Sequence, residues 1–212
     1  MQILALDTAS PIPSVTLLAA GGGVWEQPIP QDRRASEELL PAIERCFASA
    51  STSLPECDRI AVCSGPGSFT GLRIGLATAW ALGRATGVAV ETASTLEALA
   101  ESIRGRGASR VAAALDAGRE EVVLAFYSLE GKRAQLESEP VRIPLEVARE
   151  RAAGVPVISM PPDLVTPRGE PAEVSLSRAL AFAVARAPGK TLSRLAGMYS
   201  RPSAAEERHG SP

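Results

Sequence analysis

The chain alternates short apolar runs with longer segments in which apolar residues recur every three or four positions, a pattern that predicts a mixed α/β protein. The first run, 3–8, ends in Asp7-Thr8, and further apolar runs follow at 14–19 and 24–29. Three consecutive glycines separate the second run from the third. The three runs therefore predict strands in an antiparallel meander.

Two long helices are expected next. Apolar residues at helical spacing predict the first over 36–50, where Pro41 should bend it. An apolar run at 60–63 predicts a buried strand, and a glycine-rich turn after it leads into the second helix, with Thr70 as the expected N-cap. The sequence thus predicts a strand-turn-helix unit at its centre.

Small residues recur at every fourth position of this second helix, at Gly71, Gly75, Ala79 and Gly83. Glycine within a helix is about 1 kcal/mol less favourable than alanine, so helix propensity does not explain these residues. Three interpretations stay open: a phosphate site at the helix N-terminus, tight packing on the protein's own sheet, and close contact with another chain. In each interpretation another group (a phosphate, the sheet or a second chain) comes close to this face of the helix.

The second part of the chain repeats the opening pattern. The apolar run 111–118 contains Asp116, and the strand pattern 121–127 follows it, as the run ending in Asp7 is followed by its own hairpin. Further expected elements are strands at 135–142 and 155–159 and helices at 144–151 and 175–187. We predict an N-terminal half at 1–104, a smaller C-terminal half at 105–202 and a disordered tail at 203–212.

Composition narrows the classes of function. With 22 basic and 24 acidic residues the net charge is −2, which gives no overall electrostatic attraction to nucleic acid. Cys46, Cys57 and Cys63 are odd in number and form no CxxC pair, so reduced thiols and a cytoplasmic location are expected. No apolar window is long enough to predict a membrane span.

The histidine content limits the possible chemistry. His209, in the polar tail, is the chain's single histidine, so no positioned histidine base is available for a serine or cysteine hydrolase. We therefore predict no catalytic residue, no metal ligand set and no cofactor.

Residues 65–75, GPGSFTGLRIG, resemble the signature of the TsaB (YeaZ) family, which takes part in threonylcarbamoyladenosine synthesis on tRNA. The resemblance implies an actin-like, ribonuclease H-like α/β fold of two related halves, the second reduced. It also implies a non-catalytic subunit that binds a TsaD-type transferase, with a TsaE-type ATPase joining the complex. The chain would meet tRNA only through that complex, and would form a homodimer when alone.

The same resemblance suggests where the sites lie. We expect the partner-binding surface on the helices that begin near 36 and 70, and a degenerate nucleotide site around Asp7, Thr8 and Asp116. The alternatives are a magnesium- and ATP-dependent phosphotransferase that uses Asp7 and Asp116, an Asp7 that only shapes its turn, and a structural homodimer without an enzyme partner. The expected partner-binding residues are Ser36, Leu39, Leu40, Ile43, Phe69, Thr70, Gly71, Leu72, Gly75 and Ala79.

Overall fold

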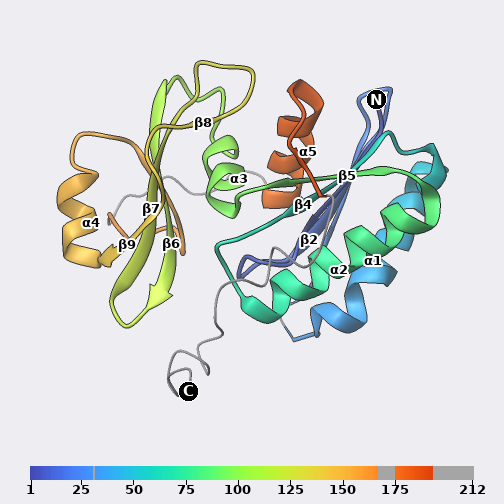
Figure 1. Cartoon of the computed structure of the whole chain (residues 1–212), viewed down its shortest axis with the longest axis horizontal. Coiled ribbons are helices and arrows are strands. Elements are labelled where there is room, and N and C mark those ends of the chain that lie inside the picture. The colour runs from blue at the N-terminus through green and yellow to red at the C-terminus, as the bar shows by residue number, and fades with distance from the viewer. Residues whose placement is uncertain (31, 167–174, 193–212) are drawn as a thin grey trace.

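The computed structural model describes residues 1–30, 32–166 and 175–192 and contains two β-sheets that lie side by side (Figure 1). In the first sheet the strand order is β11-β5-β4-β1-β2-β3. β1, β2 and β3 form the expected antiparallel meander, and β4 and β5 run parallel to β1. The strands are β1 Ile3–Asp7, β2 Ser14–Leu18, β3 Val24–Pro28, β4 Arg59–Cys63, β5 Ala89–Ala93 and β11 Lys190–Thr191.

The second sheet repeats this arrangement with fewer strands. β6 and β7 form an antiparallel hairpin, β10 pairs parallel with β6, and β9 pairs antiparallel with β7. The order β10-β6-β7-β9 thus matches β4-β1-β2-β3, and the predicted actin-like fold of two related halves, the second reduced, is confirmed. The strands are β6 Arg110–Gly118, β7 Glu121–Ser128, β8 Gln135–Leu136, β9 Val141–Pro144 and β10 Val157–Met160.

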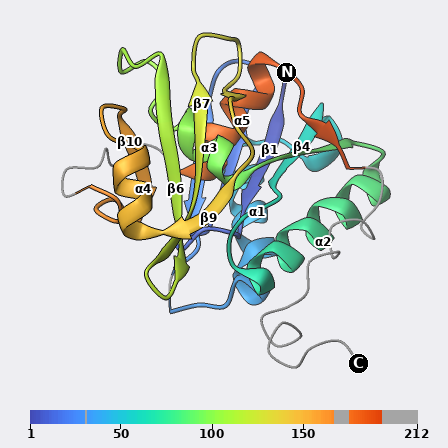
Figure 2. The ribbon, with the colours of Figure 1, turned by 60° about the vertical axis from the view of Figure 1, so that its left-hand side comes forward.

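Five α-helices in the described residues cover the sheets. α1 and α2 pack on the outer face of the first sheet, and α4 packs on the outer face of the second (Figure 2). α3 and α5 lie between the two sheets, where they contact each other. The helices are α1 Ala35–Ala50, α2 Phe69–Thr86, α3 Thr95–Glu101, α4 Leu145–Arg151 and α5 Leu176–Arg186, with a 3₁₀ turn at Leu54–Glu56.

The helices between the sheets join the halves. α3 follows β5 of the first sheet but packs mainly on the second sheet, whereas α5 follows β10 of the second sheet and packs on the first. α5 and β11 come from the later part of the chain, yet α5 packs on the first sheet and β11 pairs with β5 of that sheet. The predicted division of the chain into two halves at 104/105 therefore stays a proposal. The predicted tail, 203–212, lies outside the described residues.

The central strand-turn-helix unit is present, but its cap differs from the prediction. Ser68, not Thr70, is the N-cap of α2, because the Ser68 hydroxyl accepts a hydrogen bond from the Gly71 amide at 3.2 Å. Thr70 lies within the first turn of the helix.

Candidate functional site

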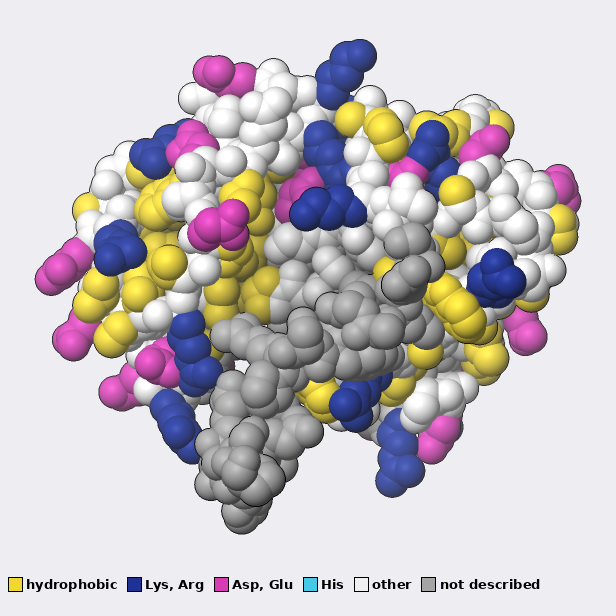
Figure 3. Space-filling view, in the orientation of Figure 1, with side chains coloured by type: hydrophobic (Ala, Val, Ile, Leu, Met, Phe, Trp, Pro, Cys, Tyr) yellow, Lys and Arg dark blue, Asp and Glu magenta, His cyan; other side chains and the backbone are white. Residues whose placement is uncertain are grey.

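A cleft of about 780 Å³ opens between the two sheets, a volume within the usual range for small-molecule sites. Its walls come from segments at the carboxyl ends of strands in both halves: 9–11 after β1, 64–69 after β4, 115–117 in β6, and Met160 at the end of β10. Hydrophobic side chains gather over the second sheet, on the left of Figure 3. The fold therefore places a cleft where α/β proteins commonly bind ligands.

Asp7 ends β1 and is completely buried. Its Oδ1 accepts hydrogen bonds from the amides of Ala9 at 2.9 Å and Ser10 at 3.2 Å, and its Oδ2 accepts one from the Ser10 hydroxyl. Burial raises the pKa of the Asp7 carboxyl, while these hydrogen bonds oppose the rise. The geometry agrees with the interpretation of Asp7 as a residue that shapes the β1–β2 turn.

Asp7→Asn is expected to keep the free energy of unfolding within about 1 kcal/mol of the wild type, whereas Asp7→Ala should lower it by about 1–3 kcal/mol. The asparagine oxygen can accept both amides and its NH₂ can donate to Ser10, but alanine leaves buried donors unpaired. Urea unfolding measures the difference. Loss of stability in Asp7→Asn equal to that in Asp7→Ala would contradict the turn-shaping role.

The same pair of proteins tests the raised pKa. A folded-state pKa above the unfolded value of 3.8 means that folding favours the protonated carboxyl. The stability of the wild type relative to Asp7→Asn should therefore fall as the pH rises from 3.8 through the raised pKa. A relative stability that rises over that interval would show a carboxylate stabilised in its ionised form.

Thr8 holds the start of α2 against the β1–β2 turn. Its hydroxyl donates to the carbonyl oxygen of Gly71 at 2.7 Å, and both residues are buried. A Cβ at Gly71 would lie 1.8 Å from the Thr8 carbonyl oxygen, and one at Gly75 would lie 2.3 Å from Thr8 Oγ1. Two of the helix glycines are thus required by contact with the chain's own first turn.

Asp116 lies in β6 and is exposed on the wall of the cleft. Its Oδ1 accepts a hydrogen bond from the Gly118 amide at 2.8 Å, at the point where the pairing of β6 with β7 shifts. Asp7, in contrast, does not line the cleft. Within 1–30, 32–166 and 175–192, no group of three or more His, Cys, Asp and Glu residues is arranged to hold a metal ion.

The glycine-rich turn before α2 packs against neighbouring backbone. A Cβ at Gly67 would lie 2.3 Å from the Ala9 carbonyl oxygen, which also accepts the Ser68 amide at 2.9 Å. On the other side, the Gly65 carbonyl oxygen accepts the Thr95 amide at 2.8 Å. These contacts support the packing interpretation of the glycines over a phosphate site.

The expected partner-binding residues divide into two groups. The first group keeps exposed surface: Ser36, Thr70, Leu40 at 52%, Phe69 at 38%, and the half-buried Leu72, of which Phe69 and Leu72 line the cleft. The others are buried against the first sheet: Leu39, Ile43, Gly71, Gly75 and Ala79.

The small-residue face of α2 is therefore not an exposed contact face, and that interpretation is wrong for Gly71, Gly75 and Ala79. The reason is the close approach of β4 and of the turn after β1, since the side chains of Val62 and Thr8 meet the position of a Cβ at Gly75. A partner-binding role for the exposed residues stays a prediction.

One group of charged residues was missed by the sequence reasoning. Glu97, Glu101, Arg104, Arg133 and Arg186 form ion pairs between the two sheets. Glu101 and Arg104 are three residues apart at the end of the helix expected near 94–103, and this spacing was a local signal for one pair. The others join residues 36 and 85 positions apart in the chain.

Comparison with known proteins relates the fold to named families. The family described as "TsaD: tRNA N6-adenosine threonylcarbamoyltransferase" matches residues 11–149, more than half of the chain. The tRNA threonylcarbamoyladenosine biosynthesis protein TsaB of Escherichia coli (strain K12) is 36% identical over 129 residues, which are 60% of this chain and 55% of the relative. The TsaB protein of Haemophilus influenzae is 35% identical to this chain, and the aligned part covers 58% of this chain and 52% of that protein. The match spans about half the length of these curated relatives.

Two solved structures are similar over more of the chain. YeaZ from Pseudomonas aeruginosa shares 34% identity over 68% of each chain, with a TM-score of 0.62. A protein described as having similarity to peptidase YeaZ from Pseudomonas aeruginosa shares 29% identity over 90% of this chain and 94% of that one, with a TM-score of 0.72.

The strand order and the family match define a protein with a TsaD-type domain of actin-like fold. Within that class, the identity to YeaZ over two thirds of both chains and the matches to TsaB proteins assign the family. The chain belongs to the TsaB (YeaZ) family.

Proposed function

We propose that this chain is a non-catalytic subunit in tRNA threonylcarbamoyladenosine synthesis, which binds and stabilises a TsaD-type transferase. Membership of the TsaB (YeaZ) family is the observation that carries the proposal. A TsaE-type ATPase joins the complex, tRNA meets the chain only through the complex, the location is cytoplasmic, and the chain forms a homodimer when alone. No helix of the described part has the length and apolar character needed to cross a membrane.

The residues available for chemistry support a non-catalytic role. Nucleophilic cysteine must ionise, but burial raises the pKa of Cys46 to about 11 and also raises those of Cys57 and Cys63. His209 lies in the tail, outside the described residues. The serines of the cleft therefore have no histidine base within the described residues. We do not transfer to this chain the peptidase activity that the description of one solved structure mentions.

We place the partner-binding surface on the outer sides of α1 and α2, which contact each other on the outer face of the first sheet. α1 exposes Leu40, and α2 exposes its first residue, Phe69, at the border between this surface and the cleft. The Arg73 guanidinium lies over the Phe69 ring at 3.9 Å. Ion pairs link Arg34 with Glu37 and Arg45 with Glu38 on the α1 side. Apolar anchors flanked by charged pairs are typical of protein interfaces.

Leu40→Asp is expected to weaken binding to the TsaD-type subunit from the same source by about 2 kcal/mol or more, on the order of 30-fold. The variant places a charge in the middle of the proposed interface. Its own stability should change by less than about 1 kcal/mol, because the side chain is already 52% exposed. Isothermal titration calorimetry measures the affinity and thermal melting measures the stability.

Leu136→Asp is the matched control. Leu136 is 44% exposed on β8 of the second sheet, away from α1 and α2, so its charge should leave the affinity unchanged. Weakened binding in Leu136→Asp with normal binding in Leu40→Asp would move the interface to the second sheet.

The cleft at the strand ends is the one observation that favours a second function, an ATP-dependent phosphotransferase using Asp7 and Asp116. That function requires stoichiometric binding of ATP with magnesium that is lost in Asp7→Ala, which calorimetry would detect. The burial of the Asp7 carboxyl and its hydrogen bonds to the amides of Ala9 and Ser10 argue against that function.

A further inference from the structure

Glu101, the last residue of α3, stands at the centre of a group of ion pairs between the sheets. Its side chain has no exposed surface. It accepts hydrogen bonds from Arg104 Nε at 2.6 Å and Nη2 at 3.0 Å, from Arg186 Nη2 of α5, and from the backbone amide of Ala134. One carboxylate therefore joins α3, α5 and the β7–β8 connection.

The two arginines extend this group to the backbone of the second half. Arg104 Nη1 donates to the carbonyl oxygens of Leu129 at 2.5 Å and Gly131 at 3.0 Å. Arg186 Nε donates to the carbonyl oxygen of Lys132 at 2.9 Å. The β7–β8 connection of the second sheet is thus tied directly to α5, which packs on the first sheet.

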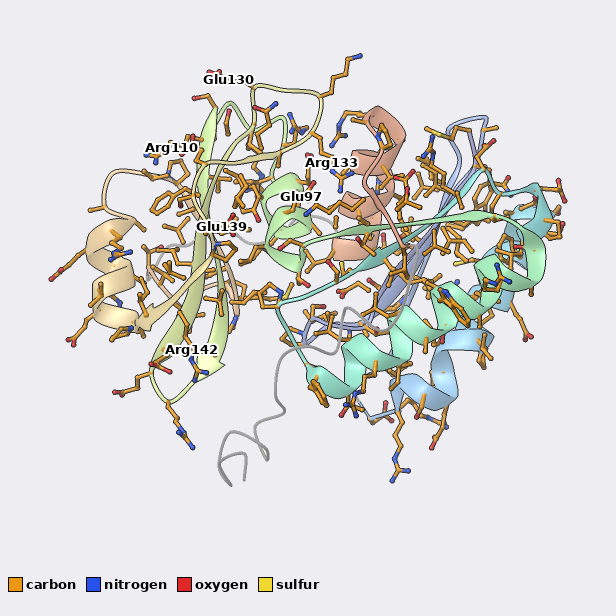
Figure 4. All side chains as sticks on the ribbon, viewed as in Figure 1. Glu97, Arg110, Glu130, Arg133, Glu139 and Arg142 are labelled. Atoms are coloured by element: carbon orange, nitrogen blue, oxygen red, sulfur yellow. The ribbon has the colours of Figure 1, made fainter. Side chains whose placement is uncertain are left out.

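A second set of contacts runs beside the first. Arg133 pairs with Glu97 of α3, and its Nη1 donates to the Ala187 carbonyl oxygen at 3.3 Å, just after α5. Figure 4 places Glu97 on α3 and Arg133 next to it, between the two sheets. The Gly189 amide donates to Glu91 of β5, so the contacts reach the first sheet itself. We call Glu97, Glu101, Arg104, Arg133 and Arg186 the arginine clamp.

The arginine clamp lies at the end of the molecule opposite the cleft. α3 starts beside Gly65, on the cleft wall, and Glu101 is at the other end of the helix. β7 ends at Ser128, which pairs with Arg110 at the start of β6, whereas the cleft lies at the end of β6. In Figure 4, Arg133 lies above and Arg142, on the cleft, lies below.

The described chain passes from the first sheet to the second through α3, which carries Glu97 and Glu101 of the clamp. α5, which ends at Arg186, already packs on the first sheet and leads into β11 of that sheet. Closure of two lobes around a ligand needs a few residues at such crossings to change their backbone angles. Here the crossing through α3 is joined to the end of α5 by charge-assisted hydrogen bonds, which are stronger than neutral ones.

We propose that the arginine clamp fixes the angle between the two sheets and holds the cleft at one width. The cleft then does not close, and the halves move as one body. This inference is independent of the proposed partner.

The test measures the distance between the sheets in the full-length chain. Spin labels are attached through Ala81→Cys on α2 and Glu150→Cys on α4, two exposed positions on opposite outer faces. The native cysteines, Cys46, Cys57 and Cys63, are buried and should not react. Double electron–electron resonance gives the distance distribution in this background and after Arg186→Met or Arg133→Met.

The unaltered clamp should give one narrow distance distribution. Arg186→Met and Arg133→Met should each broaden it or add a second population. Arg110→Met is the control, because Arg110 pairs with Glu137 within the second half, and it should leave the distribution unchanged.

Folded Arg186→Met and Arg133→Met proteins with the unaltered distribution would overturn the proposal. It would also be overturned if both variants lost cooperative thermal unfolding, since the ion pairs would then serve the stability of the whole fold. Equal broadening in Arg110→Met would show that the effect is not specific to the clamp, and would overturn it too.

Discussion

Gly75→Leu is expected to lower the free energy of unfolding by about 3 kcal/mol or more, at the upper end of overpacking effects. Gly75 is buried on the face of α2 that packs on the first sheet. A Cβ there would lie 2.3 Å from Thr8 Oγ1 and 3.5 Å from Val62 Cγ2, before the rest of the leucine is placed. The gain in helix propensity, about 1 kcal/mol, is too small to offset this clash.

Urea unfolding of Gly75→Leu and of Ala81→Leu on the same helix measures the effect. Ala81 is exposed, so its replacement should change the stability by no more than about 0.5 kcal/mol. If Gly75→Leu kept its stability and only altered self-association, α2 would face another chain at this position and the described packing would be contradicted.

The sequence could not decide between these two roles for the glycines. Small residues four positions apart predict a close approach but do not name the neighbouring element. That neighbour is Thr8, 63 positions earlier than Gly71, where their hydrogen bond forms. Only the pairing of β1 with β4 brings the two segments together.

Glu101→Gln is expected to lower the free energy of unfolding by about 3 kcal/mol, the lower end of the range for breaking a buried ion pair. The Glu101 side chain has no exposed surface, but Arg104 and Arg186 keep 20% and 34% of theirs, so water screens part of the loss. The variant leaves both arginines without their shared counter-charge, and its NH₂ group faces their N–H donors.

Urea unfolding again measures the change, with Glu121→Gln as the control. Glu121 pairs with Arg142 at the surface, where the two side chains are 35% and 42% exposed, so a loss of about 1 kcal/mol or less is expected. Similar losses in the two variants would contradict the special contribution of the buried pair.

The fold was largely predictable, because each half opens with an apolar run that ends near an aspartate and is followed by a hairpin. That pattern is local and identified both β1–β2 and β6–β7. The expected strand at 135–142 was only partly right, since β8 and β9 are separate strands that pair with different parts of β7. The return of α5 and β11 to the first sheet depends on long-range pairing that no local pattern encodes.

The candidate site was less predictable than the fold. The sequence singled out Asp7, Thr8 and Asp116, but could not tell a ligand-binding carboxylate from one that shapes a turn, because both occur at strand ends. The hydrogen bonds to the buried Asp7 favour the turn-shaping role there, whereas Asp116 is exposed on the cleft wall and its role stays a prediction. Exposure likewise separates Leu40 from Leu39, its neighbour on α1, which is 1% exposed.

Reconstituted tRNA modification shows whether the transferase needs this chain. Threonylcarbamoyladenosine formation is measured with the TsaD-type and TsaE-type proteins from the same source, with and without this chain. We expect formation to depend on the chain, to fall strongly with Leu40→Asp, and to be retained with Leu136→Asp and with Asp7→Asn. Full modification without the chain, or with Leu40→Asp at the wild-type rate, would contradict the account.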